Sequence, residues 1–231
     1  MALGSLHLNG ISWSVFRLGE TAWLLQPKVS EKILEHVHST SDLLEQSKID
    51  GLQDIIPAYD SITLIYDSQF KYDPDILSDI SSSTEQHLSR EKNIFEINVC
   101  YELGIDWNEV EVKTGLSKEE VISIHSIQNY TLAMMGFMPG FIFLDGLDQR
   151  IAVSRKEKPR IKVPSGSVGI GGNQTGIYSL ESPGGWQIIG RTTESFFDVK
   201  KTPPTELKAG DKIRFKPISN EEFDKVVAKN G

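Results

Sequence analysis

Cysteine is nearly absent from this chain of 231 residues, which contains Cys100 alone. A single cysteine excludes an internal disulfide and a zinc site built from cysteines, and it is typical of a reducing compartment. No window reaches the roughly 18 consecutive apolar residues of a membrane-spanning helix. The first residues, MALGSLHLNGIS, lack the basic and apolar regions of a secretory signal. We therefore expect a cytoplasmic protein without a membrane partner.

Positive charge is also scarce, because 24 lysines and arginines face 32 aspartates and glutamates, for a net charge of −8. This balance argues against general binding to nucleic acid or to an anionic membrane, both of which favour a basic surface. The sequence has no HExxH motif, and His36 and His38 are spaced so that they do not face one ligand together. We expect no metal site. The GxSxG, P-loop and dinucleotide-binding motifs are missing as well.

The first part of the chain, residues 1–92, alternates strand and helix signals and is expected to form a small α+β sandwich domain. Ser30 is a good cap for one helix, and Pro74 suits the first turn of another. Alternating apolar residues predict four strands, at Trp13–Arg17, Ala22–Gln26, Leu52–Pro57 and Ser61–Asp67.

The second part, residues 93–231, favours a mainly-β barrel with a terminal helix. Two capping boxes mark helix starts, Ser117-x-x-Glu120 for a short helix reaching His125, and Ser219-x-x-Glu222 for the terminal helix. Turn residues separate the expected strands, which are Phe95–Tyr101, Tyr130–Met135, Phe141–Leu144, Val168–Ile170, Ile177–Leu180, Trp186–Ile189 and Lys212–Phe215.

Glycine and proline are concentrated between Gly136 and Thr192, which indicates shaped loops on a rigid frame. Functional residues are frequent in such loops, so we expect the site there. Phe137, Pro139, Phe141 and Trp186 are candidates to line a pocket. The alternative is that these aromatic residues belong to the core, which is their usual place.

Residues 150–162 carry six basic side chains against the single acid Glu157, in a chain that is acidic overall. Arginine suits carboxylate and phosphate oxygens, so Arg155 and Arg160 are candidates to bind an anionic ligand. A solvated loop without a specific partner is an equally weighted alternative. Arg191 follows the Gly190 turn and is a further candidate for the same site.

Further positions offer polar contacts near these arginines. The turn formed by Ser165, Gly166 and Ser167 has backbone N–H groups that suit an oxyanion, although tight barrel turns explain the same glycines better. Gln174 is a candidate for a ligand contact. His125 is a candidate acid or base near neutral pH, with a histidine satisfied by carbonyls at a helix end as the alternative. These residues alone do not identify a reaction.

Several ordered motifs closely resemble the allophanate hydrolase subunit 1 family, which includes the B-type 5-oxoprolinase subunits and the kinase inhibitor KipI. The match is long and extends more weakly into the N-terminal part. The motifs that carry it are Gly136-Phe137-Met138-Pro139-Gly140-Phe141, Pro159-Arg160-x-x-Val163-Pro164-x-Gly166-Ser167-Val168, Gln174-Thr175-Gly176-Ile177-Tyr178 and Ser182-Pro183-Gly184-Gly185-Trp186-x-x-x-Gly190-Arg191-Thr192.

The resemblance implies a cyclophilin-like barrel in the second domain and two partner proteins, a subunit 2 protein (the C-type subunit) and the A-type subunit. It also implies a non-autonomous role in an ATP-dependent 5-oxoprolinase, a hydrolase that opens 5-oxoproline to L-glutamate, with ATP shared with the partners. Two alternatives stay open. One is a KipI-like inhibitor of a sensor histidine kinase, and the other is a partner module of an enzyme of urea or allophanate metabolism.

Overall fold

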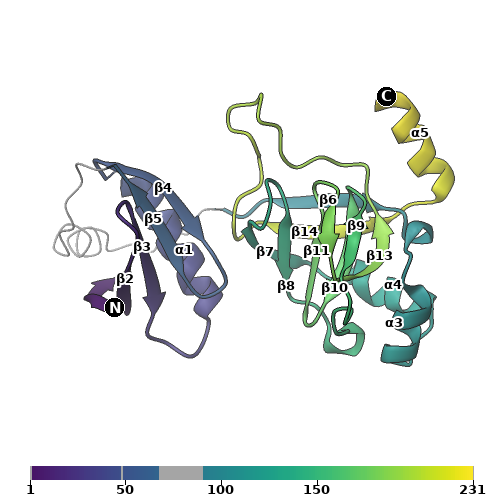
Figure 1. Ribbon diagram of the computed structural model, residues 1–231, viewed down its shortest axis with the longest axis horizontal. Coiled ribbons are helices and arrows are strands. Elements are labelled where there is room, and N and C mark those ends of the chain that lie inside the picture. The colour runs from purple at the N-terminus through teal and green to yellow at the C-terminus, as the bar shows by residue number, and fades with distance from the viewer. Residues whose placement is uncertain (1, 48, 68–90, 231) are drawn as a thin grey trace. The chain divides into compact units, whose positions relative to one another are not determined.

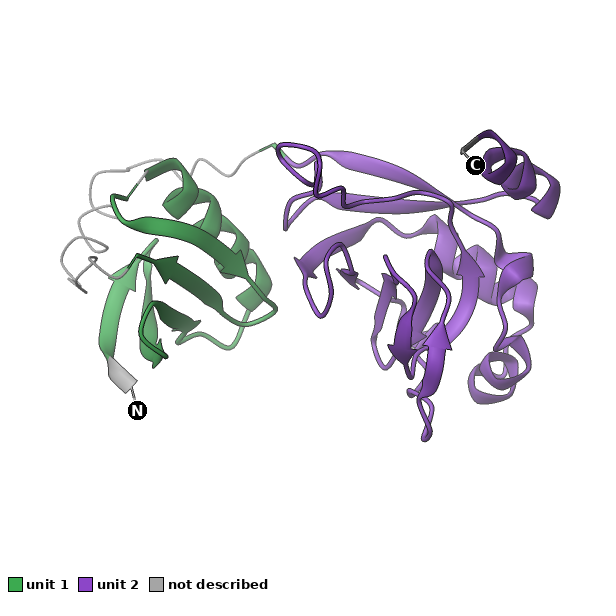
Figure 2. Ribbon diagram, turned by 45° about the horizontal axis from the view of Figure 1, so that its top comes forward, with its two compact units in different colours: residues 1–91 green, residues 92–231 purple. Residues whose placement is uncertain are grey.

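The computed structural model describes residues 2–47, 49–67 and 91–230, and the chain divides into two compact units, Met1–Glu91 and Lys92–Gly231 (Figure 2). The helix expected at Pro74 lies outside the described residues. Within those residues, no helix has both the length and the apolar character needed to cross a bilayer.

The first unit contains an antiparallel five-stranded sheet in the order β1-β2-β3-β5-β4 (Figure 1). Its strands are β1 (Ala2–Leu8), β2 (Ile11–Leu18), β3 (Ala22–Pro27), β4 (Leu52–Pro57) and β5 (Ile62–Tyr66). The helix α1 (Ile33–Ser47) buries Val37 and Leu44 in the same core as Trp13 and Trp23 of the sheet. Four strands agree with the sequence patterns, and β1 was not predicted.

The second unit contains a seven-stranded sheet that curls into a nearly closed barrel (Figure 1), which confirms the mainly-β character predicted for this part. A backbone bridge between Cys100 and Arg191 joins the chain just after one edge strand to the other edge strand, with N···O distances of 2.8 and 3.0 Å. In sheet order the strands are β13 (Gln187–Arg191), β10 (Ser167–Gly171), β11 (Gln174–Ile177), β8 (Ile142–Asp145), β7 (Tyr130–Met135), β14 (Lys212–Pro217) and β6 (Ile94–Val99).

The same unit contains the helices α3 (Trp107–Thr114), α4 (Lys118–Ile127) and α5 (Asn220–Asn230), and the 3₁₀ turns η1 (Tyr101–Leu103) and η2 (Gln149–Ile151). Both predicted capping boxes are confirmed. Ser117 Oγ accepts from the Glu120 N–H at 3.3 Å, and Ser219 Oγ accepts from the Glu222 N–H at 3.3 Å. The helix α3 was not predicted.

A two-stranded ribbon, β9 (Arg160–Val163) with β12 (Ser182–Gly184), forms a second small sheet in this unit. A strand was predicted at Ile177–Leu180. The structure has β11 at Gln174–Ile177 instead, so the strand ends where it was expected to begin. Beyond Ile177 the pairing becomes irregular: the Tyr178 N–H donates to the carbonyl of Ser167, and the Tyr178 carbonyl accepts from the N–H of Gly166, whose φ is +78°. The ribbon carries Arg160, one of the candidate site residues.

Candidate anion-binding site

Asp106 joins the start of α3 to the barrel. Its Oδ2 accepts the backbone N–H of Ile188 in β13 at 2.7 Å, and the Ile105 and Asp106 N–H groups both donate to the Ile188 carbonyl. The backbone at Gly104 passes very close to β13, because a Cβ on Gly104 would lie 2.4 Å from the carbonyl oxygen of Ile189. The Asp106 carboxylate, whose side chain is 3% exposed, is therefore held rigidly beside β13.

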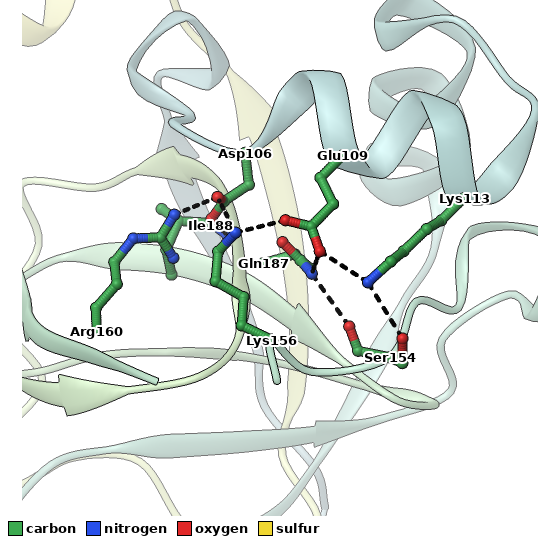
Figure 3. Close-up of polar contacts among 8 residues, drawn as sticks. All are labelled: Asp106, Glu109, Lys113, Ser154, Lys156, Arg160, Gln187 and Ile188. Carbon is green, nitrogen blue, oxygen red and sulfur yellow. Dashed lines mark hydrogen bonds and ion pairs between the residues drawn. The ribbon is translucent and has the colours of Figure 1, made fainter. Parts of the chain in front are cut away.

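Two basic side chains from the run 150–162 converge on this buried carboxylate (Figure 3). Lys156 Nζ lies 2.9 Å from Asp106 Oδ1, and Arg160 Nη2 donates to the same oxygen. Lys156 Nζ also lies 2.5 Å from Glu109 Oε2, one turn further along α3. The basic segment is thus fastened to α3 by ion pairs and is not a free solvated loop.

Glu109 extends this set of contacts towards Lys113 and Gln187 (Figure 3). Its Oε1 accepts from Lys113 Nζ at 2.8 Å and from Gln187 Nε2 at 2.7 Å. The hydrogen bond from Lys113, together with those from Lys156 and Gln187, lowers the pKa of Glu109 to about 2. Glu109 is therefore a carboxylate at neutral pH.

We refer to Asp106, Glu109, Lys113, Lys156, Arg160 and Gln187 as the α3 network. Three cations face two carboxylates in it, so it holds one excess positive charge. Two of its buried atoms, Arg160 Nη1 and Gln187 Oε1, have no hydrogen-bond partner among the described residues. A buried donor without a partner is costly, and an anion that reaches Arg160 would relieve that cost.

Arg155 lies close to the same ribbon. Its guanidinium carbon is 5.6 Å from the centre of the Trp186 ring, a cation–π contact. Burial raises the pKa of Tyr178, while a hydrogen bond from the Trp186 backbone and the charges of Arg155 and Arg160 act in the opposite direction.

Arg191 and the Ser165–Ser167 turn form a separate group. Arg191 Nε donates to the Ser165 carbonyl at 2.9 Å, and the Gly166 N–H donates to the Tyr178 carbonyl at 2.7 Å. The turn needs glycine, because Gly166 has φ +78° and an added Cβ would lie 2.1 Å from the Thr192 carbonyl. The Ser167 N–H donates to the Pro164 carbonyl. These N–H groups donate to carbonyls in and beside the turn itself, which agrees with the alternative that the glycines form a tight barrel turn.

Gln174 begins β11 at the hairpin that connects it with β10, where it pairs with Gly171. This position is at the end of the barrel strands. No described contact joins its side chain to the α3 network or to Arg191.

His125 is fully buried inside the barrel and not in a loop site. Its Nδ1 is 2.7 Å from the Tyr101 hydroxyl, and its Nε2 is 2.9 Å from Thr175 Oγ1. Because the Thr175 hydroxyl donates to the Gly169 carbonyl, it accepts from His125, which places the proton on Nε2. Burial lowers the pKa of His125 to about 3. We interpret it as a neutral structural histidine that joins α4 to β11, in place of the expected acid or base.

The aromatic candidates also lie differently from the expectation of a pocket lining. Phe141 and Trp186 are 2% and 4% exposed and belong to a core cluster with Tyr178, whereas Phe137 is 70% exposed and Pro139 is exposed. The ring centres of Phe141 and Trp186 are 5.6 Å apart in an edge-to-face arrangement. The indole lies so close to β10 that a Cβ on Gly171 would be 2.6 Å from its Nε1. Phe141 and Trp186 therefore belong to a core, which was the alternative interpretation.

Sequence reasoning missed Asp106, Glu109 and Gln187, the residues that hold the basic side chains in place. One local signal was available, because Glu109 and Lys113 have the i, i+4 spacing of a helical ion pair. The contacts of Asp106 with Arg160 and of Glu109 with Gln187 join residues 54 and 78 positions apart, and no local pattern predicts them.

The fold and the α3 network define a two-unit protein whose barrel carries three cations around the buried carboxylate of Asp106 and the partly exposed carboxylate of Glu109. Residues 13–207 match the family model described as carboxyltransferase domain, subdomain C and D, and the chain belongs to this family. The B-type 5-oxoprolinase subunit of Bacillus subtilis is 37% identical, over 92% of this chain and 96% of that protein. Its counterpart in Escherichia coli O157:H7 is 35% identical, over 87% and 94%. The resemblance stated from the motifs is confirmed.

Solved structures share the architecture. PH0987 from Pyrococcus horikoshii matches 90% of this chain and 99% of its own, with 41% identity and a TM-score of 0.55. TTHA0988 matches 86% of this chain but 40% of its own, with 32% identity and a TM-score of 0.73. Urea amidolyase of K. lactis, at 18% identity and a TM-score of 0.72, supports the fold alone.

Proposed function

We propose that this chain is a non-autonomous subunit of an ATP-dependent 5-oxoprolinase complex that opens 5-oxoproline to L-glutamate. The observation that carries the proposal is the match to the B-type 5-oxoprolinase subunit of Bacillus subtilis along nearly the whole length of both chains. The partners would be the C-type and A-type subunits of the same system. We also propose that the barrel is of the cyclophilin-like type.

The chemistry of the reaction explains why such a complex needs a cation-rich site. A lactam is a poor electrophile, so hydrolysis is helped when the γ-phosphoryl group of ATP is transferred to the amide oxygen. Water then adds to the amide carbon, the bond between this carbon and the ring nitrogen breaks, and phosphate leaves. The carboxylate of 5-oxoproline and the phosphates of ATP are anions that cationic side chains stabilise.

We assign anion binding to Arg155 and Arg160. Arg160 supports this because its Nη1 is buried without a partner among the described residues, while its Nη2 is anchored on Asp106. Arg155 is exposed and lies near the same ribbon. Lys156 is a further cation of the same network, paired with Asp106 and Glu109. Arg191 and Gln174 have no described contact with these residues, and we place them outside this site.

The test is an assay of the chain assembled with its C-type and A-type partner subunits. Release of ADP that depends on 5-oxoproline, with matching formation of glutamate, is the expected result. The chain alone should show neither. An assembled, folded complex that lacks 5-oxoproline-dependent ATP hydrolysis would contradict the proposal.

Arg155→Ala tests the assigned residue within that assay. The KM for the anionic substrate should rise about tenfold, as expected for loss of one charged contact. The matched control is Arg150→Ala, which removes an arginine from the same basic run that pairs only with its neighbour Asp148 in the described contacts. A KM for Arg155→Ala equal to that of the control would remove Arg155 from the site.

A second candidate function is favoured by a local similarity to another class of enzyme. Urea amidolyase of Lachancea kluyveri is 36% identical over 81 residues, which are 33% of this chain and 4% of that protein. The chain would then act as a partner module in urea or allophanate metabolism. ATP hydrolysis that depends on urea or allophanate, and not on 5-oxoproline, would favour this function.

A further inference from the structure

A pocket of about 300 Å³ lies beside β6, between Phe95 and the segment 194–207. None of its lining residues belongs to the α3 network. Its apolar wall consists of Phe95, Phe196, Phe197, Pro203, Pro204 and Leu207. Such a wall suits the hydrocarbon part of a small ligand.

The segment 194–207 has a defined shape because hydrogen bonds and packing hold it. The Asp198 N–H donates to the Pro204 carbonyl at 2.8 Å, and the Lys201 N–H donates to the Asp198 carbonyl at 3.0 Å. Phe197 packs so closely on Gly140 that an added Cβ there would lie 2.6 Å from the Phe197 Cβ. Leu207 is buried and belongs to the barrel core. The pocket is thus part of the fold.

The charged residues of the lining are mostly acidic. Glu194, Asp198 and Glu206 face one cation, Lys201, so the pocket has two excess negative charges. The backbone N–H of Asn98 holds Glu194 Oε1 at 2.8 Å and fixes the orientation of this carboxylate. Burial raises the pKa of Glu194, because the carboxylate is less well solvated there than in water.

We infer that this pocket binds an organic cation, an alkylammonium or alkylguanidinium group on an apolar stem. The stem would pack on the phenylalanine and proline side chains, and the cation would lie against Glu194 and the aromatic rings, which both attract positive charge. The inference goes beyond the proposed function, because 5-oxoproline, glutamate and ATP are anions that this pocket would repel. The same group occurs in free amines and in the lysine and arginine side chains of a polypeptide.

Titration of the full chain, followed by amide NMR, tests the inference with three probes. Butylguanidinium is the cation, butylurea is its neutral counterpart of similar shape, and a capped Ala-Arg-Ala peptide presents the same group on a polypeptide. Saturable shifts within residues 194–207 are expected with butylguanidinium and not with butylurea. Stronger binding of the peptide would identify a side chain as the natural guest, and stronger binding of butylguanidinium would identify a free amine.

Variants connect the binding to the acidic lining. Glu194→Gln should weaken butylguanidinium binding about tenfold, the effect of losing one charged contact. Glu206→Gln removes another acidic charge of the pocket lining and should also weaken butylguanidinium binding. Glu206 is exposed, so this variant does not put folding at risk. Glu221→Gln on α5, which removes an exposed acid paired with Lys225, should bind like the wild type. Equal shifts with butylurea, or no shifts in 194–207 up to the solubility limit of the cation, would overturn the inference.

Discussion

His125 illustrates how a polar side chain can serve the barrel interior. The ring stacks on Phe215 with centres 4.6 Å apart, while its two nitrogens are occupied by Tyr101 and Thr175. Each nitrogen has one partner, and the ring is neutral. The residue type alone is equally typical of catalysis and of structure, so its role could not be decided before its burial was known.

The burial of His125 predicts a dependence of stability on pH. Its pKa is lowered from 6.5 to about 3, so between these values the unfolded chain binds one more proton than the folded chain. Stability should therefore fall as the pH decreases through this window, by about 1 kcal/mol between about pH 7 and about pH 5.5. Urea unfolding at the two pH values measures this loss.

His125→Gln should abolish that part of the pH dependence, although the variant is less stable at both pH values. His7→Gln, at an exposed position, is the matched control and should keep the wild-type loss. An undiminished loss in His125→Gln would show that other groups cause it.

Gly176 lies where β11 passes between β8 and the indole of Trp186. An added Cβ would be 2.3 Å from the carbonyl oxygen of Ile142 and 3.0 Å from the Trp186 ring. Since neither the backbone nor the packed ring can easily move, Gly176→Ala should lower the free energy of unfolding by about 1–3 kcal/mol. Gly136→Ala is the control, because its Cβ would meet only the flexible end of Met134 at 3.1 Å. Equal unfolding midpoints in urea would contradict this packing argument.

At the scale of elements, the capping box of α4 was predictable because its residues are local in sequence. Ser117→Ala removes the acceptor for the Glu120 N–H and should reduce the free energy of unfolding by about 1 kcal/mol. Ser123→Ala, at an exposed position in the same helix, should have little effect. Thermal unfolding of both variants measures the difference, and an equal change in the two would argue against the cap.

Elements defined by a repeating local pattern were predictable, and those defined by distant contacts were not. Alternation identified β2 and β5, whereas α3 has a weak apolar pattern, with Trp107 and Val110 as its buried residues. One contact that holds α3 in place is the hydrogen bond from the Ile188 N–H to the Asp106 carboxylate, between residues 82 positions apart. The candidate site was predicted in the same partial way. Lys156 and Arg160 were visible in the basic run, but Lys113 and the carboxylates that bind these cations were not.

At the scale of the whole molecule, each hydrophobic core takes its residues from one unit. The core around Trp13 and Trp23 lies within the first unit. The barrel core, which includes Tyr130 and Phe215, and the aromatic cluster around Trp186 lie within the second. A unit that contains its own complete core meets the main requirement for independent folding.

We therefore predict that residues 92–231, expressed alone, fold into the same barrel. Amide NMR spectra of this fragment and of the full chain should overlay for residues of the barrel core, and the fragment should unfold in one cooperative transition. The bridge between Cys100 and Arg191 makes the comparison sharp, because both residues belong to the fragment and their amide protons should be protected from exchange as in the full chain. If the fragment lost its dispersed resonances and exchanged these amide protons rapidly, the barrel would depend on the first unit, because the barrel sheet would then fail to close when the first unit is absent.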